Sequence, residues 1–172
     1  MDLELVYPDG IIARHPRGVT GAEVARSIGS RLAKAAIAVA IDGEPLDLDR
    51  PLDHGGKFEV ITDTTEAGRH ITRHSAAHIL AQAVLGLFPA AHFAIGPPIE
   101  DGFYYDFDIG RPFTPSDLEA LSARMAEIVA NDQPFRRESM GREQALALFA
   151  DQPFKREISS RWTPPRSRTT PR

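Results

Sequence analysis

An α+β fold with two domains is what the sequence predicts, and three features of the 172 residues support it. Residues 1–63 combine several short apolar strands with one capped helix. Residues 64–158 begin with a long helical pattern and continue with short strands and further helices. Residues 159–172 show no hydrophobic period and are rich in Arg, Pro, Ser and Thr. This last composition predicts a disordered tail.

Short apolar strands dominate residues 1–63. Residues 3–7 and 11–14 are separated by a Pro-Asp-Gly turn, so they predict a hairpin. Residues 36–41 form an apolar run that suits a buried strand, and residues 58–61 predict a final strand. Two strands, a helix and two or three further strands indicate a β-grasp, ubiquitin-like sheet.

A helix between these strands is marked at both ends. Thr20 is a suitable N-cap, Glu23 completes a capping box, and Gly29 ends the helix. No catalytic constellation is visible in this domain. Its loop acids are expected to be solvated turn residues rather than ligands: Asp47, Asp49 and Asp53.

Composition excludes several classes of protein. The chain is 42% hydrophobic and 26% charged, and no apolar run reaches the roughly 18 residues of a membrane span. It contains no cysteine, which excludes disulfides and thiolate chemistry and is compatible with the cytosol. The net charge is −4, which is unlike a polybasic RNA-binding protein. Residues 158–172, by contrast, carry four arginines and no acid.

Two histidines one helical turn apart are the first candidate site. A helix is predicted over residues 69–88, and its apolar residues form a core-facing stripe. His74 and His78 fall on the opposite side, among further apolar residues rather than charges. We therefore expect a helix covered on both sides, with the two imidazoles lining a cleft, where they suit proton transfer or ligation.

Zinc binding is an alternative interpretation of His74 and His78, because histidines four residues apart can share one metal ion. The residues between them are Ser-Ala-Ala, so the catalytic Glu of the HExxH motif is missing. His70, His92 or Asp106 could supply a third ligand, but the spacing selects none of them.

The rest of this domain is predicted as short strands and helices. Residues 92–95 predict a strand and Gly96-Pro97-Pro98 a turn. Residues 102–107 predict an aromatic strand whose alternation places Phe103, Tyr105 and Phe107 on one face. The remaining expectations are a helix capped by Thr114, a strand near 135–138, a helix over 142–149 and a last strand from about 154.

Several long sequence motifs resemble segments of the threonyl-tRNA synthetases of the bacterial type. Residues 1–63 are similar to their TGS domain. Residues 64–158 are similar to most of their editing domain, the second N-terminal domain. The matching motifs are RHSAAH at 73–78, AIGPPIEDGFYYDFD at 94–108 and FTPSDLEAL at 113–121. Two histidines four residues apart are weak evidence for a family. A motif as long as the one at 94–108 is unlikely to recur by chance.

The resemblance implies a function and assigns residues to it. The implied reaction is the hydrolysis of mischarged seryl-tRNA(Thr), with the acceptor end of tRNA(Thr) as partner, in the cytoplasm and without a cofactor. ATP would be used only in an aminoacylation domain outside this sequence. The implied catalytic residues are His74, His78 and Lys155, and the implied substrate-binding residues are Tyr105, Gly96 and Asp106.

The resemblance ends near residue 158, so we expect an N-terminal fragment without the aminoacylation and anticodon-binding domains. The Arg-rich tail suggests a frameshift or a truncated reading frame, and a basic RNA-binding tail is the alternative. Two other functions remain open. One is a non-catalytic, TGS-bearing module that binds tRNA or a translation factor, and the other is a zinc-dependent aminoacyl-tRNA deacylase.

Overall fold

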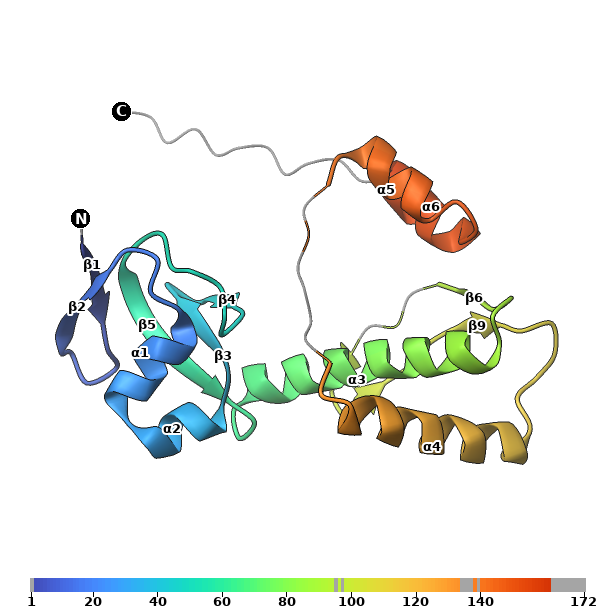
Figure 1. Ribbon diagram of the computed structural model, residues 1–172, viewed down its shortest axis with the longest axis horizontal. Coiled ribbons are helices and arrows are strands. Elements are labelled where there is room, and N and C mark those ends of the chain that lie inside the picture. Colours follow the sequence, from blue (N-terminus) through green and yellow to red (C-terminus); the bar gives the residue numbers. More distant parts are fainter. Residues whose placement is uncertain (1, 95, 97, 134–137, 139, 162–172) are drawn as a thin grey trace. The chain divides into compact units, whose positions relative to one another are not determined.

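The computed structural model describes residues 2–94, 96, 98–133, 138 and 140–161. The chain folds into two compact units, residues 1–73 and 74–172, and the division falls inside the long helix α3 (Glu66–Leu87). Strands and helices are both present in each unit, which confirms the α+β class (Figure 1). The predicted boundary at residue 63 marks the approach to α3, but the first unit extends further because Ile71 of α3 packs against its sheet.

The first unit is built on a five-stranded sheet with the order β2-β1-β5-β3-β4. Its strands are β1 (Asp2–Val6), β2 (Ile12–Pro16), β3 (Ala36–Ile41), β4 (Glu44–Leu46) and β5 (Gly56–Thr62). The hairpin of β1 and β2 is antiparallel, β5 runs parallel to β1, and β3 is antiparallel to both β4 and β5. The predicted β-grasp arrangement is therefore confirmed.

Two short helices accompany this sheet. Helix α1 (Gly21–Ile28) begins with the predicted capping box, in which Thr20 and Glu23 exchange hydrogen bonds, and it ends at Gly29. Gly21 at its start faces Val39 of β3 so closely that any side chain there would overlap that valine. Helix α2 (Ser30–Ala35) was not predicted, because the glycine that ends α1 also precedes α2.

The core of the first unit lies between α1 and the sheet. Phe58, Leu5 and Val24 are almost completely buried and belong to one cluster. At the predicted turn, Asp42 and Gly43 both have positive φ angles, and the carboxylate of Asp42 accepts the Lys57 N–H at 2.9 Å. This unit therefore closes its own hydrophobic core and fixes its turns with local hydrogen bonds.

The second unit combines helices with very short strands. Its elements after α3 are β6 (His92–Phe93), β7 (Pro98–Ile99), β8 (Gly102–Phe103), β9 (Phe107–Asp108), α4 (Pro115–Ala130), α5 (Arg142–Leu148) and α6 (Pro153–Arg161). In the described residues β6 pairs with β9 and β7 with β8, both antiparallel. The predicted sheet is thus present as two separate two-stranded ribbons.

Helices α3 and α4 enclose the core of the second unit and run side by side (Figure 1). Ala83 and Val84 of α3 are fully buried against Leu121 and Ile128 of α4. The side of α3 that carries the histidines is also partly covered, since Ala81 is buried there. None of the helices in the described part of the chain is long and apolar enough to cross a membrane.

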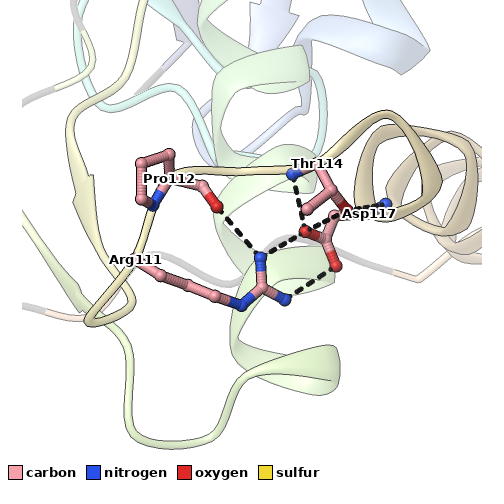
Figure 2. A network of polar contacts seen from close by, with 4 residues as sticks. All are labelled: Arg111, Pro112, Thr114 and Asp117. Carbon is pink, nitrogen blue, oxygen red and sulfur yellow. Dashed lines mark hydrogen bonds and ion pairs between the residues drawn. The ribbon is translucent and has the colours of Figure 1, made fainter.

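Helix α4 starts with the predicted cap, which is reinforced from outside the helix (Figure 2). Thr114 and Asp117 form a capping box around the Pro115 start of the helix. Arg111 donates two hydrogen bonds to the Asp117 carboxylate, at 2.6 and 3.0 Å, and a third to the Pro112 carbonyl. These contacts hold the pKa of Asp117 well below its usual range.

Two predictions in the second unit were wrong. The last strand, expected from about residue 154, is helix α6, because Pro153 suits the first helical position and the Arg156 N–H bonds to the Gln152 carbonyl. The aromatic strand over residues 102–107 is broken into β8 and β9, which pair with different partners. The strand predicted near 135–138 and most of the predicted tail lie outside the described residues.

Candidate functional site

The two histidines of α3 lie one turn apart with their rings stacked. The ring centroids of His74 and His78 are 4.8 Å apart, and the ring planes make an angle of 21°. The cleft predicted beside these histidines stays a prediction, but both rings are exposed. The physical reason is that the buried neighbours on this side of α3 are alanines, which leave the larger rings standing out from the packed surface.

Lys155 approaches the aromatic residues of the second unit from α6. Its Nζ lies 5.1 Å from the ring centroid of Phe93 and 6.0 Å from that of Tyr105, within the range of a cation–π contact. The side chain is partly buried, and this burial lowers the pKa of Lys155. An ammonium group held over two rings is less hydrated than one on an open surface.

The charge of Lys155 also acts on His78. Burial is the largest cause of the lowered pKa of His78, followed by the charges of His74 and Lys155. His78 keeps solvent access, but its ring is partly desolvated. A lowered pKa leaves the imidazole neutral at physiological pH, so that one ring nitrogen can accept a proton.

Tyr105 is at the centre of an aromatic cluster. Its ring stacks on Phe107 at 4.7 Å and meets the edge of Phe93 at 6.1 Å. A Cβ atom on Gly96 would overlap the Tyr105 ring, so only glycine allows the backbone to pass at that distance. Burial raises the pKa of Tyr105, which keeps its hydroxyl group protonated. Gly96 therefore supports the position of Tyr105.

Asp106 does not join this cluster. The predicted alternation places its side chain on the opposite face from Tyr105 and Phe107, and Asp106 is exposed while those two are partly buried. Its backbone carbonyl accepts the Ala94 N–H at 3.1 Å, which continues the pairing of β6 with β9. The structure gives Asp106 a backbone role, and its substrate-binding role stays a prediction.

Two residues that the sequence analysis did not single out belong to this region. Phe93 lies beneath the Lys155 ammonium group. Gln152 donates to the Ala91 carbonyl at 3.1 Å and accepts the Phe93 N–H at 3.3 Å. A glutamine before a proline is too common to indicate such contacts, so no local signal could have identified Gln152.

The donor set gives the zinc alternative no support. Among the residues that the structure describes, no group of three His, Cys, Asp or Glu side chains is close enough to hold a metal ion. His74 and His78 would supply only two ligands, and the cationic Lys155 nearby would oppose a bound cation. The described residues are better suited to hydrogen bonding and proton transfer.

The arrangement can perform acid–base chemistry on a bound anion or ester. A neutral imidazole, His78, can accept a proton, while the ammonium group of Lys155 can stabilise negative charge. Tyr105 and Phe93 present aromatic faces to the ammonium group of Lys155. Lys155 of α6 thus lies over rings from β6 and from the segment before β9, and its charge reaches His78 of α3.

Comparisons with known proteins agree on both units. Residues 4–62 match the TGS domain. The chain is 47% identical over 148 residues to a threonine--tRNA ligase of Symbiobacterium thermophilum, with 86% of the chain and 23% of that protein covered. Similar relatives occur in Phenylobacterium zucineum, at 49% over 147 residues, and in an Azoarcus species, at 50% over 142 residues. These alignments cover 86% and 83% of the chain and 22% of each relative.

Proposed function

This chain belongs with the N-terminal region of the threonine--tRNA ligases and carries a TGS domain, and on that premise we propose that it hydrolyses mischarged seryl-tRNA(Thr). The chain spans less than a quarter of the length of the relatives it matches. The proposed activity therefore concerns the second unit of this chain and not the ligation of threonine to tRNA.

The chemical need for such a reaction follows from the two amino acids. Serine lacks one methyl group of threonine, and a binding pocket discriminates by only about 1–3 kcal/mol for a group of that size. A ligase that joins threonine to tRNA therefore also produces some seryl-tRNA. A second site that removes serine after transfer restores accuracy, because it tests the product independently of the first site.

The observation that carries the proposal is the meeting of His78, Lys155 and Tyr105 in the second unit. The positive charge of Lys155 is near enough to lower the pKa of His78, and its Nζ lies 6.0 Å from the Tyr105 ring centroid. These residues come from three separate segments of the chain. Their proximity supports a shared role, because a solvated lysine or histidine would need no such neighbours.

Each group would have its own role in the hydrolysis of the seryl ester. Water would add to the ester carbonyl carbon while His78 accepts one of its protons. Lys155 would stabilise the negative charge that develops on the carbonyl oxygen or hold the terminal nucleotide. The bond to the ribose oxygen would then break, and that oxygen would take up the proton, which gives free serine and tRNA.

His74 and Tyr105 would position the substrate rather than transfer protons. His74 stacks on His78 and would orient the water or the terminal ribose. Tyr105 would form the wall of the site against which the terminal adenosine or the amino acid rests. Gly96 would contribute by letting the Tyr105 ring approach the backbone.

The decisive experiment measures the hydrolysis of purified seryl-tRNA(Thr) by the 172-residue chain. We expect release of serine above the spontaneous rate, and little release of threonine from threonyl-tRNA(Thr). His78→Ala should lower the enzymatic rate about 100-fold or more, since general acid–base catalysis contributes roughly 10²–10⁴-fold. The matched control is His54→Ala, which removes an exposed histidine of the first unit.

Equal rates for the chain, for His78→Ala and for no protein would contradict the proposal. A second candidate would then apply, namely a non-catalytic module that binds the acceptor end of tRNA. The exposure of both imidazoles favours this alternative, because catalytic groups are usually sheltered from water. Binding of tRNA that weakens with salt, with no release of serine, would identify it.

A further inference from the structure

We propose that Gln152 is a positioning residue for Lys155, because its side-chain amide pairs with the open edge of β6 and thereby fixes the start of α6. This inference rests on the proposed function only in giving Lys155 a catalytic task. The contacts themselves are independent of it. The amide of Gln152 makes two hydrogen bonds with one strand, to the Ala91 carbonyl at 3.1 Å and from the Phe93 N–H at 3.3 Å.

The edge of β6 explains why one amide can make both bonds. The Ala94 N–H points toward β9, where it bonds to the Asp106 carbonyl at 3.1 Å. Because successive residues of a strand alternate in direction, the polar groups of Ala91 and Phe93 point the other way. In a parallel pair of strands, one residue bonds to the carbonyl before and the N–H after the residue opposite it. Here these two groups are the Ala91 carbonyl and the Phe93 N–H, on either side of His92. The Gln152 amide takes the place of the residue from the neighbouring strand.

The position of Gln152 at the helix start is unusual. It precedes Pro153, the first residue of α6, and its carbonyl accepts the Arg156 N–H at 3.0 Å, so it occupies the N-cap position. Ser, Thr, Asp and Asn are preferred there because their short side chains cap the helix. The chain uses Thr at the same position of α1 and α4. At α6 the side chain is directed to β6 instead.

Lys155 is also in an unfavourable place for its charge. It lies in the first turn of α6, which contains no acidic residue, and the positive end of the helix dipole disfavours a cation there. It is partly buried over Phe93, the same residue whose N–H bonds to Gln152. Gln152 thus departs from the N-cap preference, and Lys155, three residues later, departs from the charge preference of a helix start. Such violations are typical of functional sites, where position matters more than local stability.

Nuclear magnetic resonance of the 172-residue chain can measure separately the pairing of Gln152 with β6 and the position of the Lys155 side chain. In the unmodified chain the side-chain protons of Lys155 should be shifted upfield by the Phe93 and Tyr105 rings, and the Phe93 amide should exchange slowly. Gln152→Met keeps the length of the side chain but removes both hydrogen bonds. We expect Gln152→Met and Gln152→Ala to lose the Lys155 shift and to accelerate exchange of the Phe93 amide, with α6 still helical.

The matched control is Gln144→Ala, which removes a glutamine whose Oε1 accepts the local Gly141 N–H at the start of α5. It should leave both signals unchanged. A Lys155 shift that survives in Gln152→Met would overturn the inference, and so would loss of the helical Cα shifts of α6 in both variants. The latter result would make Gln152 a residue that holds the helix together rather than one that aims Lys155.

These signals need no tRNA, so failure of the seryl-tRNA assay would leave this inference standing. If the chain does hydrolyse seryl-tRNA, Gln152→Met should reduce the rate by the same factor as Lys155→Gln, with the value of KM less affected. A rate for Gln152→Met equal to that of the unmodified chain would contradict the positioning role.

Discussion

The two units of this chain achieve order in different ways. The first unit forms a five-stranded sheet and buries large side chains such as Phe58, Leu5 and Ile41 completely. The second unit has only two-residue strands in its described part, and its fully buried residues are small ones such as Ala83 and Val84. The candidate site lies in the second unit, at the two-residue strand β6.

The two units thus rely on different interactions for their stability. Strand pairing between distant segments and a filled core make the first unit self-sufficient. Both units leave large apolar side chains exposed, such as Ile12 in the first and Leu118 and Val129 in the second. The second unit keeps its polar site groups together through ring contacts and single side-chain hydrogen bonds. Regions with few buried contacts open more easily, which suits a site that must admit a large substrate.

The largest expected effect tests whether the first unit depends on its own core. Phe58→Ala should destabilise it by about 3–5 kcal/mol, because the substitution leaves a cavity among residues that cannot collapse fully. Denaturant unfolding followed by hydrogen exchange at individual amides would measure this. The control is Ile12→Ala, at a residue 62% exposed, for which a change within about 0.5 kcal/mol is expected.

We expect the amides of α4 to keep their protection in Phe58→Ala, because their core residues Leu121 and Ile128 belong to a separate cluster. If these amides lost protection at the same denaturant concentration as β5, the distinction between the two units would be wrong.

A smaller effect is expected from the capping box that each unit contains. Thr20→Ala and Thr114→Ala each remove a hydroxyl that accepts a backbone N–H at 3.3 Å, at a cost of about 1 kcal/mol. Each substitution should act only on its own unit, as judged by the unfolding midpoints of α1 and α4. Thr→Ser at either position retains the hydroxyl and should restore most of the loss. Equal destabilisation by Ser and Ala would show that the hydroxyl is not the cause.

The smallest effect concerns the ionisation of His78. Lys155→Gln removes a positive charge, so the pKa of His78 should rise toward its ordinary value of 6.5. Because the pKa is lower in the folded chain, the second unit should lose stability as the pH falls through 6.5, since the unfolded state then binds more protons. Ring resonances titrated by nuclear magnetic resonance would report both trends. Arg156→Gln, the neighbouring cation on α6, is the control, and an equal shift there would argue against a specific role for Lys155.

Local features of the chain were predicted well. The caps at Thr20 and Thr114 were found because a capping box involves residues only three apart. The alternation of partly buried and exposed residues over 103–107 was found, although the strand that predicted it is broken at 104–106. The helix of residue 154 onward was missed because a short, mixed segment has no clear hydrophobic period, although Pro153 suits the first position of a helix.

By itself, then, the sequence determined the α+β class, the β-grasp fold, the capped starts of α1 and α4 and the choice of His74 and His78, while the resemblance to the threonyl-tRNA synthetases added Lys155 and Tyr105. Only the tertiary structure decided that the two imidazoles are exposed and stacked, that Lys155 lies over Phe93, and that Gln152 pairs with the edge of β6. The physical reason is the separation along the sequence between the residues that interact. Caps and alternation depend on neighbours within one turn or pleat, whereas the site is made by segments that meet only when the chain has folded.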